Sequence, residues 1–398
     1  MRALLRGNVL WLSVVSLLND TSSEMIYPLL PTFLVVSLGA SPTFLGAVEG
    51  AAESVASLLK LASGWISDRW GRRPLVLTGY GLAAAVRPVI ALAVAPWHIL
   101  AIRLTDRTGK GIRSAARDAL LAESVAPDVR GTAYGIHRSA DHLGATVGPL
   151  IASGILFLLA GGVAGDATED HLRVTFALAA IPAILAVAIL AWKVREPRES
   201  RVVQAEPMAT DTAPAASVFQ GPFLRWLGVV LLFTLGNATD AFLLLRAQEL
   251  GVPVAALPLL WSAHHATKTL FSVAGGVLSD RTGPRRAIAL GWLTYAVTYG
   301  AFAFAGRAWH AWALFLLYGL FHALTEAPEK ALVAKLAPEG RRGAAFGAYH
   351  AAIGIAALPA GILFGTLWTL FGAPVAFLTG AALSLAAALL LPITRERA

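Results

Sequence analysis

Long apolar runs follow one another along the whole chain, separated only by short polar breaks. Each run is about 20 residues long, the length that an α-helix needs to cross a hydrocarbon core of roughly 30 Å. Charged residues make up only 14% of the 398 residues, whereas a soluble domain carries about 25%. The pattern predicts an all-α polytopic membrane protein. We expect twelve transmembrane helices, at residues 9–36, 43–66, 75–95, 98–122, 130–160, 172–194, 223–249, 255–279, 286–305, 309–336, 343–370 and 373–394.

Basic residues gather in alternate loops between these runs. Arg72 and Arg73 fall in one such loop and Arg285 and Arg286 in another, whereas the loop near 161–171 belongs to the other set and is acidic. By the positive-inside rule both termini are predicted to be cytoplasmic. The net charge of +8 is therefore assigned to orientation in the bilayer, and no nucleic-acid partner is expected.

A short hydrophilic hinge occurs twice. The segment GWISDRWGRRP from Gly64 to Pro74 returns 212 residues later as GVLSDRTGPRR from Gly276 to Arg286. Each copy places an acid, a glycine turn and a cationic cluster between two apolar runs. The repeat predicts two six-helix halves, 1–194 and 223–398, joined by a solvated cytoplasmic linker at 195–222. Parallel repeats of this kind place a pseudo-two-fold axis along the membrane normal and a cavity between the halves.

The hinge resembles the G-x-x-x-D-R-x-G-R-R signature of the major facilitator superfamily, and the resemblance extends over the whole chain. It implies the fold of that family and a cytoplasmic latch that forms in the outward-facing state and breaks when the cytoplasmic side opens. A plainer interpretation is that the charges only fix topology. Pro284 replaces the first arginine of the second copy, so that latch is expected to be weaker. The residues of the gating motif are Gly64, Asp68, Arg69, Gly71, Arg72 and Arg73, then Gly276, Asp280, Arg281, Gly283, Arg285 and Arg286.

The fifth predicted helix contains a second motif. Gly144, Gly148 and Pro149 resemble the glycine-proline motif that antiporters of the same superfamily carry there, although Ala152 stands where the last glycine is expected. The resemblance implies antiport. Alternatively, these glycines only allow close helix packing.

Many ionisable residues fall inside the predicted helices. Such a side chain costs at least roughly 2.5 kcal/mol at mid-bilayer, so it usually faces a cavity or a partner. Asp20 and Glu24 are four residues apart, as are Glu49 and Glu53, so each pair shares a helix face. We expect Asp20 or Glu53 to carry the coupling proton. The predicted cavity and coupling residues are Asp20, Glu24, Glu49, Glu53, Arg103, Arg107, Asp141, Asp240, His322 and Glu326.

The fourth predicted helix has one ionic face for about four turns, from Arg103 to Asp118. The resemblance implies a functional arginine here, and of Arg103 and Arg107 the second is favoured. The cytoplasmic end, from Arg113 to Glu123, is interpreted as an ion-pair network that holds the second, fourth and fifth helices together.

We therefore expect a monomeric secondary active transporter that exports a small molecule by alternating access and uses protons as its coupling partner. No Walker loop, Gly-x-Ser-x-Gly elbow or His-Glu-x-x-His motif occurs, so neither an ATPase nor an enzyme is predicted. No cofactor is expected, and the chain has no cysteine. One alternative is an exporter of nickel, cobalt or iron, since Asn19–Pro31 and Asp106–Asp118 resemble a bacterial branch that includes nickel-resistance permeases; His322 and Glu326 would then be ligands. An alternative of another class is a non-transporting receptor or scaffold.

Overall fold

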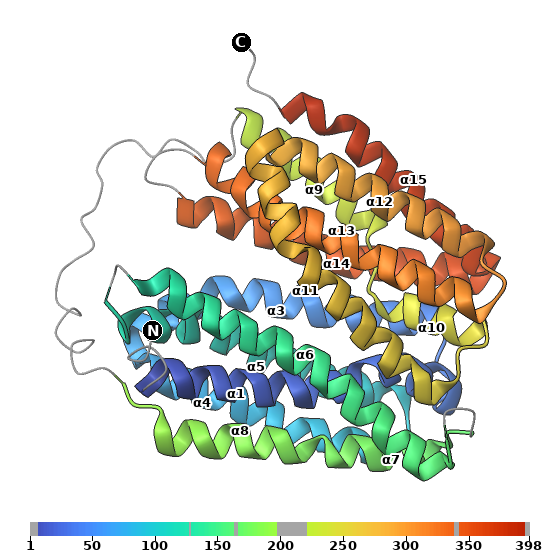
Figure 1. The fold of residues 1–398 in the computed structure, drawn as a ribbon, viewed down its shortest axis with the longest axis horizontal. Coiled ribbons are helices and arrows are strands. Elements are labelled where there is room, and N and C mark those ends of the chain that lie inside the picture. The colour runs from blue at the N-terminus through green and yellow to red at the C-terminus, as the bar shows by residue number, and fades with distance from the viewer. Residues whose placement is uncertain (1–6, 127–128, 163–165, 197–220, 338–341, 395–398) are drawn as a thin grey trace.

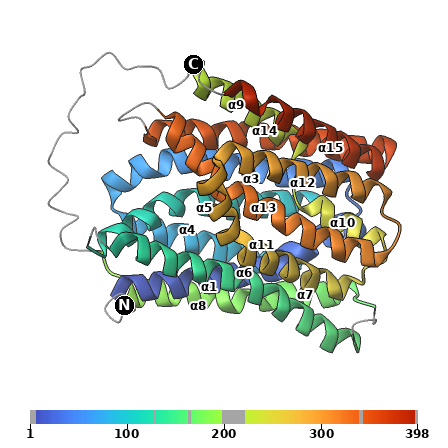
Figure 2. The same cartoon turned by 45° about the horizontal axis from the view of Figure 1, so that its top comes forward.

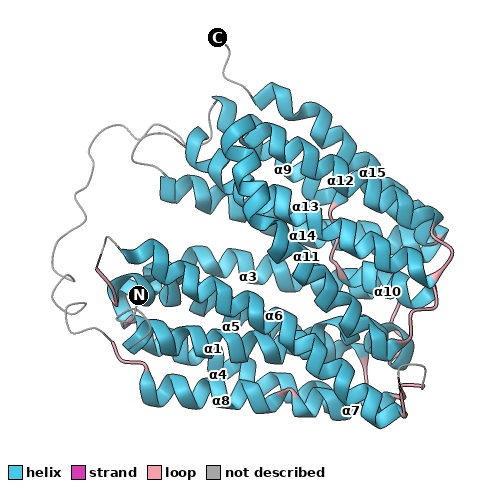
Figure 3. Cartoon of the chain, in the orientation of Figure 1, coloured by secondary structure: helices cyan, strands magenta, loops and turns pink. Residues whose placement is uncertain are grey.

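The computed structural model describes residues 7–126, 129–162, 166–196, 221–337 and 342–394, and within these ranges it leaves out the side chains of residues 61–62, 64–70, 130–131 and 342–343. All regular elements in these ranges are helices, as Figure 3 shows. The expected all-α fold class is confirmed.

The helices of the first half form six membrane-crossing units within the described residues. The first unit is built from four consecutive pieces and the third and sixth from two each. Their bounds are α1 (Gly7–Ile26), η1 (Tyr27–Leu29), α2 (Leu30–Thr32), η2 (Phe33–Ser37), α3 (Pro42–Trp70), α4 (Arg72–Val86), η3 (Arg87–Leu92), α5 (Pro96–Glu123), α6 (Arg130–Ala160), α7 (Glu169–Leu178) and α8 (Ala180–Lys193).

The second half repeats the arrangement with six further units in the described part of the chain. Their bounds are α9 (Gly221–Gly236), α10 (Ala241–Glu249), η7 (Val254–Ala256), α11 (Leu257–Thr282), α12 (Pro284–Phe304), α13 (Ala308–Leu336), α14 (Arg342–Phe371), α15 (Ala373–Leu390) and η8 (Leu391–Thr394). Figure 1 shows the two halves side by side, with the start of α1 and the end of α15 at the same end of the molecule.

Prolines have different effects in different helices. The first unit changes from α to 3₁₀ and then to π geometry at Pro28 and Pro31, where the missing N–H groups break the regular hydrogen-bond pattern. In contrast, α6 continues through Pro149 and α14 through Pro359. Both α6 and α14 are therefore continuous helices despite their prolines.

Both hinge copies turn in the same way. Gly71 has φ +84° and Gly283 has φ +87°, a region that residues with a Cβ rarely adopt. Each glycine lets the chain leave one long helix and start the next almost at once: α3 ends at Trp70 and α4 begins at Arg72. The repeat seen in the sequence is therefore a repeat of backbone conformation as well.

Seven of the described helical segments are long and apolar enough to cross a membrane by length and composition alone. They are Arg72–Leu92, Thr132–Ala160, Glu169–Lys193, Gly221–Glu249, Pro284–Phe304, Ala344–Phe371 and Ala373–Thr394. The units built on α1, α3, α5, α11 and α13 are missing from this set. Each of these five helices contributes charged side chains to the cavity described below, and this ionic face lowers its mean hydropathy.

The halves meet along two pairs of long helices. α3 packs against α14, and α6 packs against α11; Figure 2 shows α3 and α14 in the middle of the molecule. Gly46 and Gly361 form the closest crossing, because a Cβ on Gly46 would lie only 1.9 Å from the Gly361 carbonyl oxygen. This contact between backbones joins the two halves.

Candidate functional site

A cavity of about 570 Å³ lies between the halves. Its wall combines side chains of α1, α3 and α5 with side chains of α9, α11, α13 and α14. Toward the hinge end it extends to Lys60, Lys330 and His350, and in Figure 1 the halves diverge at this end.

Hydrogen bonds between the halves close the opposite end. Thr32 donates to Gln248 at 2.6 Å, and the hydroxyls of Thr43 and Thr369 lie 3.0 Å apart. Nearer the cavity, the hydroxyls of Tyr27 and Thr239 lie 3.3 Å apart. The cavity is therefore sealed at the end remote from Gly71.

Seven of the ten predicted cavity residues line this space. They are Glu24, Glu49, Glu53, Arg107, Asp240, His322 and Glu326. The other three, Asp20, Arg103 and Asp141, lie within the first half, between its own helices. The expectation that they line the cavity differs from the structure because helix periodicity gives the face of a residue but not the helix that this face meets.

Arg103 lies behind the cavity wall and neutralises Glu49. Its guanidinium donates twice to the carboxylate, with N···O distances of 2.8 and 2.5 Å, and both side chains are buried. A two-pronged contact of this kind holds the carboxylate in one orientation.

A second buried pair depends on Arg87, which the sequence analysis did not single out. Arg87 Nε donates to Asp106 at 3.0 Å, and its Nη1 donates to the backbone carbonyl of Asn19 at 2.9 Å. The guanidinium thus joins η3, α5 and α1. The sequence signal that could have revealed this pair is a lone arginine inside an apolar predicted helix, because such a charge needs a partner.

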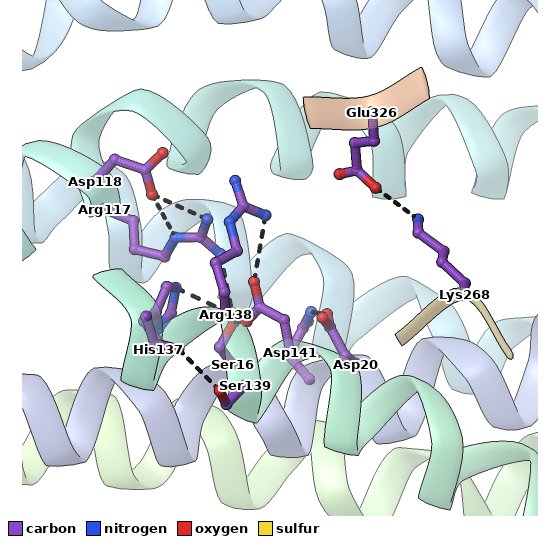
Figure 4. A network of polar contacts seen from close by, with 12 residues as sticks. Ser16, Asp20, Arg117, Asp118, His137, Arg138, Ser139, Asp141, Lys268 and Glu326 are labelled. Atoms are coloured by element: carbon purple, nitrogen blue, oxygen red, sulfur yellow. Dashed lines mark hydrogen bonds and ion pairs between the residues drawn. The ribbon is translucent and has the colours of Figure 1, made fainter. Parts of the chain in front are cut away.

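Asp141 belongs to a polar network inside the first half, which Figure 4 shows. The hydroxyl of Ser16 donates to its carboxylate, His137 Nε2 lies 3.8 Å from it, and Arg138 Nη1 lies 3.6 Å from it. Asp20 accepts a hydrogen bond from Asn19 at 2.9 Å. The bond from Ser16 to Asp141 ties α1 to α6.

The ionic end of α5 contacts α4, which was not expected, and also α6, which was: Tyr134 of α6 donates to the backbone carbonyl of Asp118 at 2.8 Å. Arg72, at the start of α4, forms an ion pair with Glu123, and Arg113 donates to the carbonyl of Gly79 and lies over the ring of Tyr80. The predicted network thus joins α5 to both α4 and α6. Rotation of α5 about its axis decides which neighbour its charges reach, and spacing alone does not fix it.

Three acids of the cavity accept hydrogen bonds from aromatic side chains. Trp261 donates to Glu24 at 2.8 Å and Tyr318 to Asp240 at 2.5 Å. Glu329 accepts two bonds, from Trp292 at 3.1 Å and from Tyr349 at 2.5 Å. The bond from Trp261 to Glu24 crosses from one half to the other.

Glu326 forms ion pairs with two lysines. Lys268 lies 3.0 Å from its carboxylate and Lys330 lies 3.5 Å from it; the first pair also appears in Figure 4. Across the described ranges, no three His, Cys, Asp or Glu side chains come together as metal ligands would. The geometry around His322 therefore adds nothing to the metal-export alternative.

The hinge arginines contact their own half. Arg73 donates to the carbonyls of Ala191 and Val194 at the end of α8, and Arg285 donates to Thr394 at the end of the second half. In the second copy Asp280, Arg281 and Arg286 are exposed, and a Cβ added at Gly276 would meet no atom within 4 Å. Gly64, Asp68 and Arg69 lie in a stretch whose side chains are outside the described set.

The motif of α6 is a packing surface. A Cβ on Gly144 would lie 2.5 Å from the carbonyl oxygen of Leu17, and one on Gly148 would lie 2.4 Å from that of Thr21. Gly144 and Gly148 therefore let α6 approach α1 closely, which matches the packing interpretation of this motif. Pro149 follows inside a continuous helix.

Comparison with known proteins identifies the family. The Major Facilitator Superfamily description matches residues 12–263 and 226–398. An uncharacterised MFS-type transporter of Methanocaldococcus jannaschii is 30% identical over 402 aligned positions, which cover 97% of this chain and 94% of that protein. The chain belongs to the major facilitator superfamily and is a non-enzymatic membrane transporter.

Two further comparisons show how far the similarity reaches. The multidrug resistance protein MdtH of Cronobacter sakazakii is 32% identical over 132 residues, one third of each chain. The crystal structure of the nucleoside transporter NupG superposes with a TM-score of 0.81 at 15% identity and covers 98% of this chain and 100% of that one. The second likeness concerns the fold alone.

Proposed function

We propose that the protein exports a small molecule from the cytoplasm by proton-coupled alternating access, from the inner membrane of a bacterium and with both termini inside. The name of the partly matching multidrug resistance protein supports the direction. The basic loops of the sequence support the orientation, because the hinges at Gly71 and Gly283 would then face the cytoplasm.

The cavity supports alternating access in this proposal. It is bounded by both halves and closed at one end by hydrogen bonds between them. Rocking of the halves about the α3–α14 contact would break these bonds and open the closed end, so the same residues would face each side in turn. The monomer and the boundaries 1–194, 195–222 and 223–398 are part of the proposal.

The observation that carries proton coupling is the bond from Trp261 to Glu24 between the halves. An ionised carboxylate accepts an N–H bond more strongly than a neutral carboxyl does. Protonation of Glu24 would therefore weaken a contact that holds the halves in this conformation. A proton shifts a conformational equilibrium only through such a difference between states.

Proteoliposomes loaded with a pH-sensitive dye test this function. A panel of organic anions, organic cations, nickel and cobalt is applied across an imposed pH gradient. One member of the panel should drive proton movement in the wild type, and Glu24→Gln should abolish that movement while exchange of labelled substrate continues. Asp20→Asn and Glu53→Gln are run beside it, and Glu249→Gln is the control because Glu249 pairs with Arg246 outside the cavity.

Unchanged proton coupling in Glu24→Gln contradicts the role of Glu24, and loss of coupling in Glu53→Gln or Asp20→Asn alone moves the role to that acid. A protein that moves neither protons nor any member of the panel is a scaffold or receptor.

A further inference from the structure

Three cations of the cavity have no ionic partner. Lys60, Arg107 and Lys110 line its first-half wall, and no carboxylate of the described residues forms an ion pair with any of them, whereas Arg103 and Lys268 do have such partners. The Nε of Arg107 is buried without a hydrogen-bond partner. A buried donor without a partner is costly, and no described carboxylate forms an ion pair with these three partly buried cations, so this wall has capacity for an anion.

Close packing places Lys110 in the wall. It lies between two glycines: a Cβ on Gly109 would lie 2.5 Å from the Gly79 carbonyl oxygen, and one on Gly111 would lie 2.6 Å from the Cβ of Leu59. These contacts bring α5 against α4 on one side and α3 on the other. Lys110 therefore stays on the face of α5 that is directed toward the cavity, with Arg107 one turn away.

The acids of the cavity do not neutralise this cluster. Glu24 and Asp240 already accept bonds from Trp261 and Tyr318, and Glu49 is bound by Arg103. Glu53 is within electrostatic range of all three cations, and it accepts a hydrogen bond from Ser57. Glu24 is also within electrostatic range of Arg107 and Lys110, but neither Glu24 nor Glu53 forms an ion pair with any of the three cations, and these two carboxylates do not balance three positive charges.

The opposite wall has a different character, which the 212-residue repeat makes clear. The position of Glu49 corresponds to Trp261, and that of Glu53 to His265. The position of Arg107 corresponds to Gly319, and that of Lys110 to His322. Rings therefore replace the charges at three of these four positions, and Trp261 packs against His264 and His265.

We propose that the transported molecule is an organic anion whose carboxylate or phosphate binds between Lys60, Arg107 and Lys110 while its apolar body packs against Trp261 and His265. This inference rests on the proposed transport function and names its substrate class. Arg107 suits either group, because a guanidinium offers paired donors to carboxylate and phosphate alike.

Direct binding tests the proposal without any gradient. The full chain in lipid nanodiscs is titrated with benzoate, phenyl phosphate, neutral benzamide and benzylammonium, and binding is followed by calorimetry. At least one anion should bind saturably, and benzamide and benzylammonium should not. Arg107→Gln and Lys110→Gln should each weaken anion binding by roughly tenfold or more, the loss expected for one charge-assisted bond.

Two controls separate binding from folding. Lys110→Arg keeps the charge and should bind the anion, and Lys335→Gln removes an exposed cation that lies outside the cavity lining and should bind like the wild type. Preference for benzoate identifies a carboxylate site and preference for phenyl phosphate a phosphate site. Failure of both anions to bind, tighter binding of benzylammonium, or anion binding unchanged in Arg107→Gln and Lys110→Gln each overturns the proposal. Loss of proton coupling in proteoliposomes leaves it untouched, because binding is measured at equilibrium.

Discussion

Arg73 and Arg285 occupy equivalent positions in the two hinge copies, and each holds the end of the last helix of its own half. Arg73 donates to the carbonyl of Ala191 at 2.7 Å and to that of Val194 at 2.8 Å. Arg285 donates to the hydroxyl and the carbonyl of Thr394 at 2.9 and 2.8 Å. In this conformation both arginines join the start of the third unit to the end of the sixth. The sequence repeat is therefore also a repeat of contacts.

Replacement of either arginine should destabilise the protein. Arg73→Gln and Arg285→Gln each remove bonds from a charged donor, which are worth about 1.5–3 kcal/mol apiece before solvent exposure reduces them. We expect a lower thermal unfolding midpoint for both variants in detergent, with Arg286→Gln as the exposed control. An unchanged midpoint combined with lost transport would instead support a role in gating.

The ion pair of Arg103 and Glu49 should show strong coupling in a double-mutant cycle. Breaking a buried pair leaves an uncompensated charge and typically costs about 3–5 kcal/mol. Glu49→Gln and Arg103→Gln should therefore each lower the free energy of unfolding, and the double variant should lose much less than the sum of the two.

The control for this cycle is the ion pair of Arg173 and Glu169, which lies on α7 and is partly exposed. Its coupling should stay within about 1 kcal/mol. If the losses in free energy of unfolding from Glu49→Gln and Arg103→Gln simply add in the double variant, the ion pair contributes little to stability. Each residue then acts through other contacts.

Sequence patterns predicted the fold more fully than the site. Apolar run length gave the helices, and the repeated hinge gave the two halves, because both follow from local sequence and membrane thickness. The spacing of Glu49 and Glu53 put both on one helix face, and in the structure both line the cavity. It did not reveal that Arg103 neutralises Glu49 from behind, because helix rotation and neighbour choice are set by packing of distant segments.

The sequence also did not predict which aromatic side chains donate hydrogen bonds to the acids of the cavity. Trp261 and Glu24 are far apart in the chain and meet because α11 of one half packs against η1, which directly follows α1, in the other half. Arg87 was overlooked for a similar reason, since its partners Asp106 and Asn19 lie on two other helices. Charge inside an apolar helix signals a partner without naming it.

Addition of a methyl group at the closest crossing should impair transport. A Cβ on Gly361 would lie 2.2 Å from the Gly46 carbonyl oxygen, and one on Gly46 would lie 1.9 Å from that of Gly361. Gly46→Ala or Gly361→Ala should force α3 and α14 apart, at a cost of about 1–3 kcal/mol, and should lower the transport rate. Gly300→Ala is the matched control, because nothing lies within 4 Å of its added Cβ. Normal transport in Gly361→Ala would show that the halves do not pivot on this contact.

A reversible cross-link can test whether the closed end must open. The chain has no cysteine, so the pair Thr43→Cys and Thr369→Cys introduces its two thiols alone, at positions whose hydroxyl oxygens lie 3.0 Å apart. This proximity favours a disulfide, whose geometry requires neighbouring Cβ atoms. Oxidation should join α3 to α14, hold the halves in the conformation described here and abolish transport in proteoliposomes. Reduction should restore it. Each single cysteine variant should transport equally well under both conditions, since it cannot form the intramolecular bond. Transport that continues at the wild-type rate in the fully cross-linked protein would contradict alternating access by separation of the halves at this end.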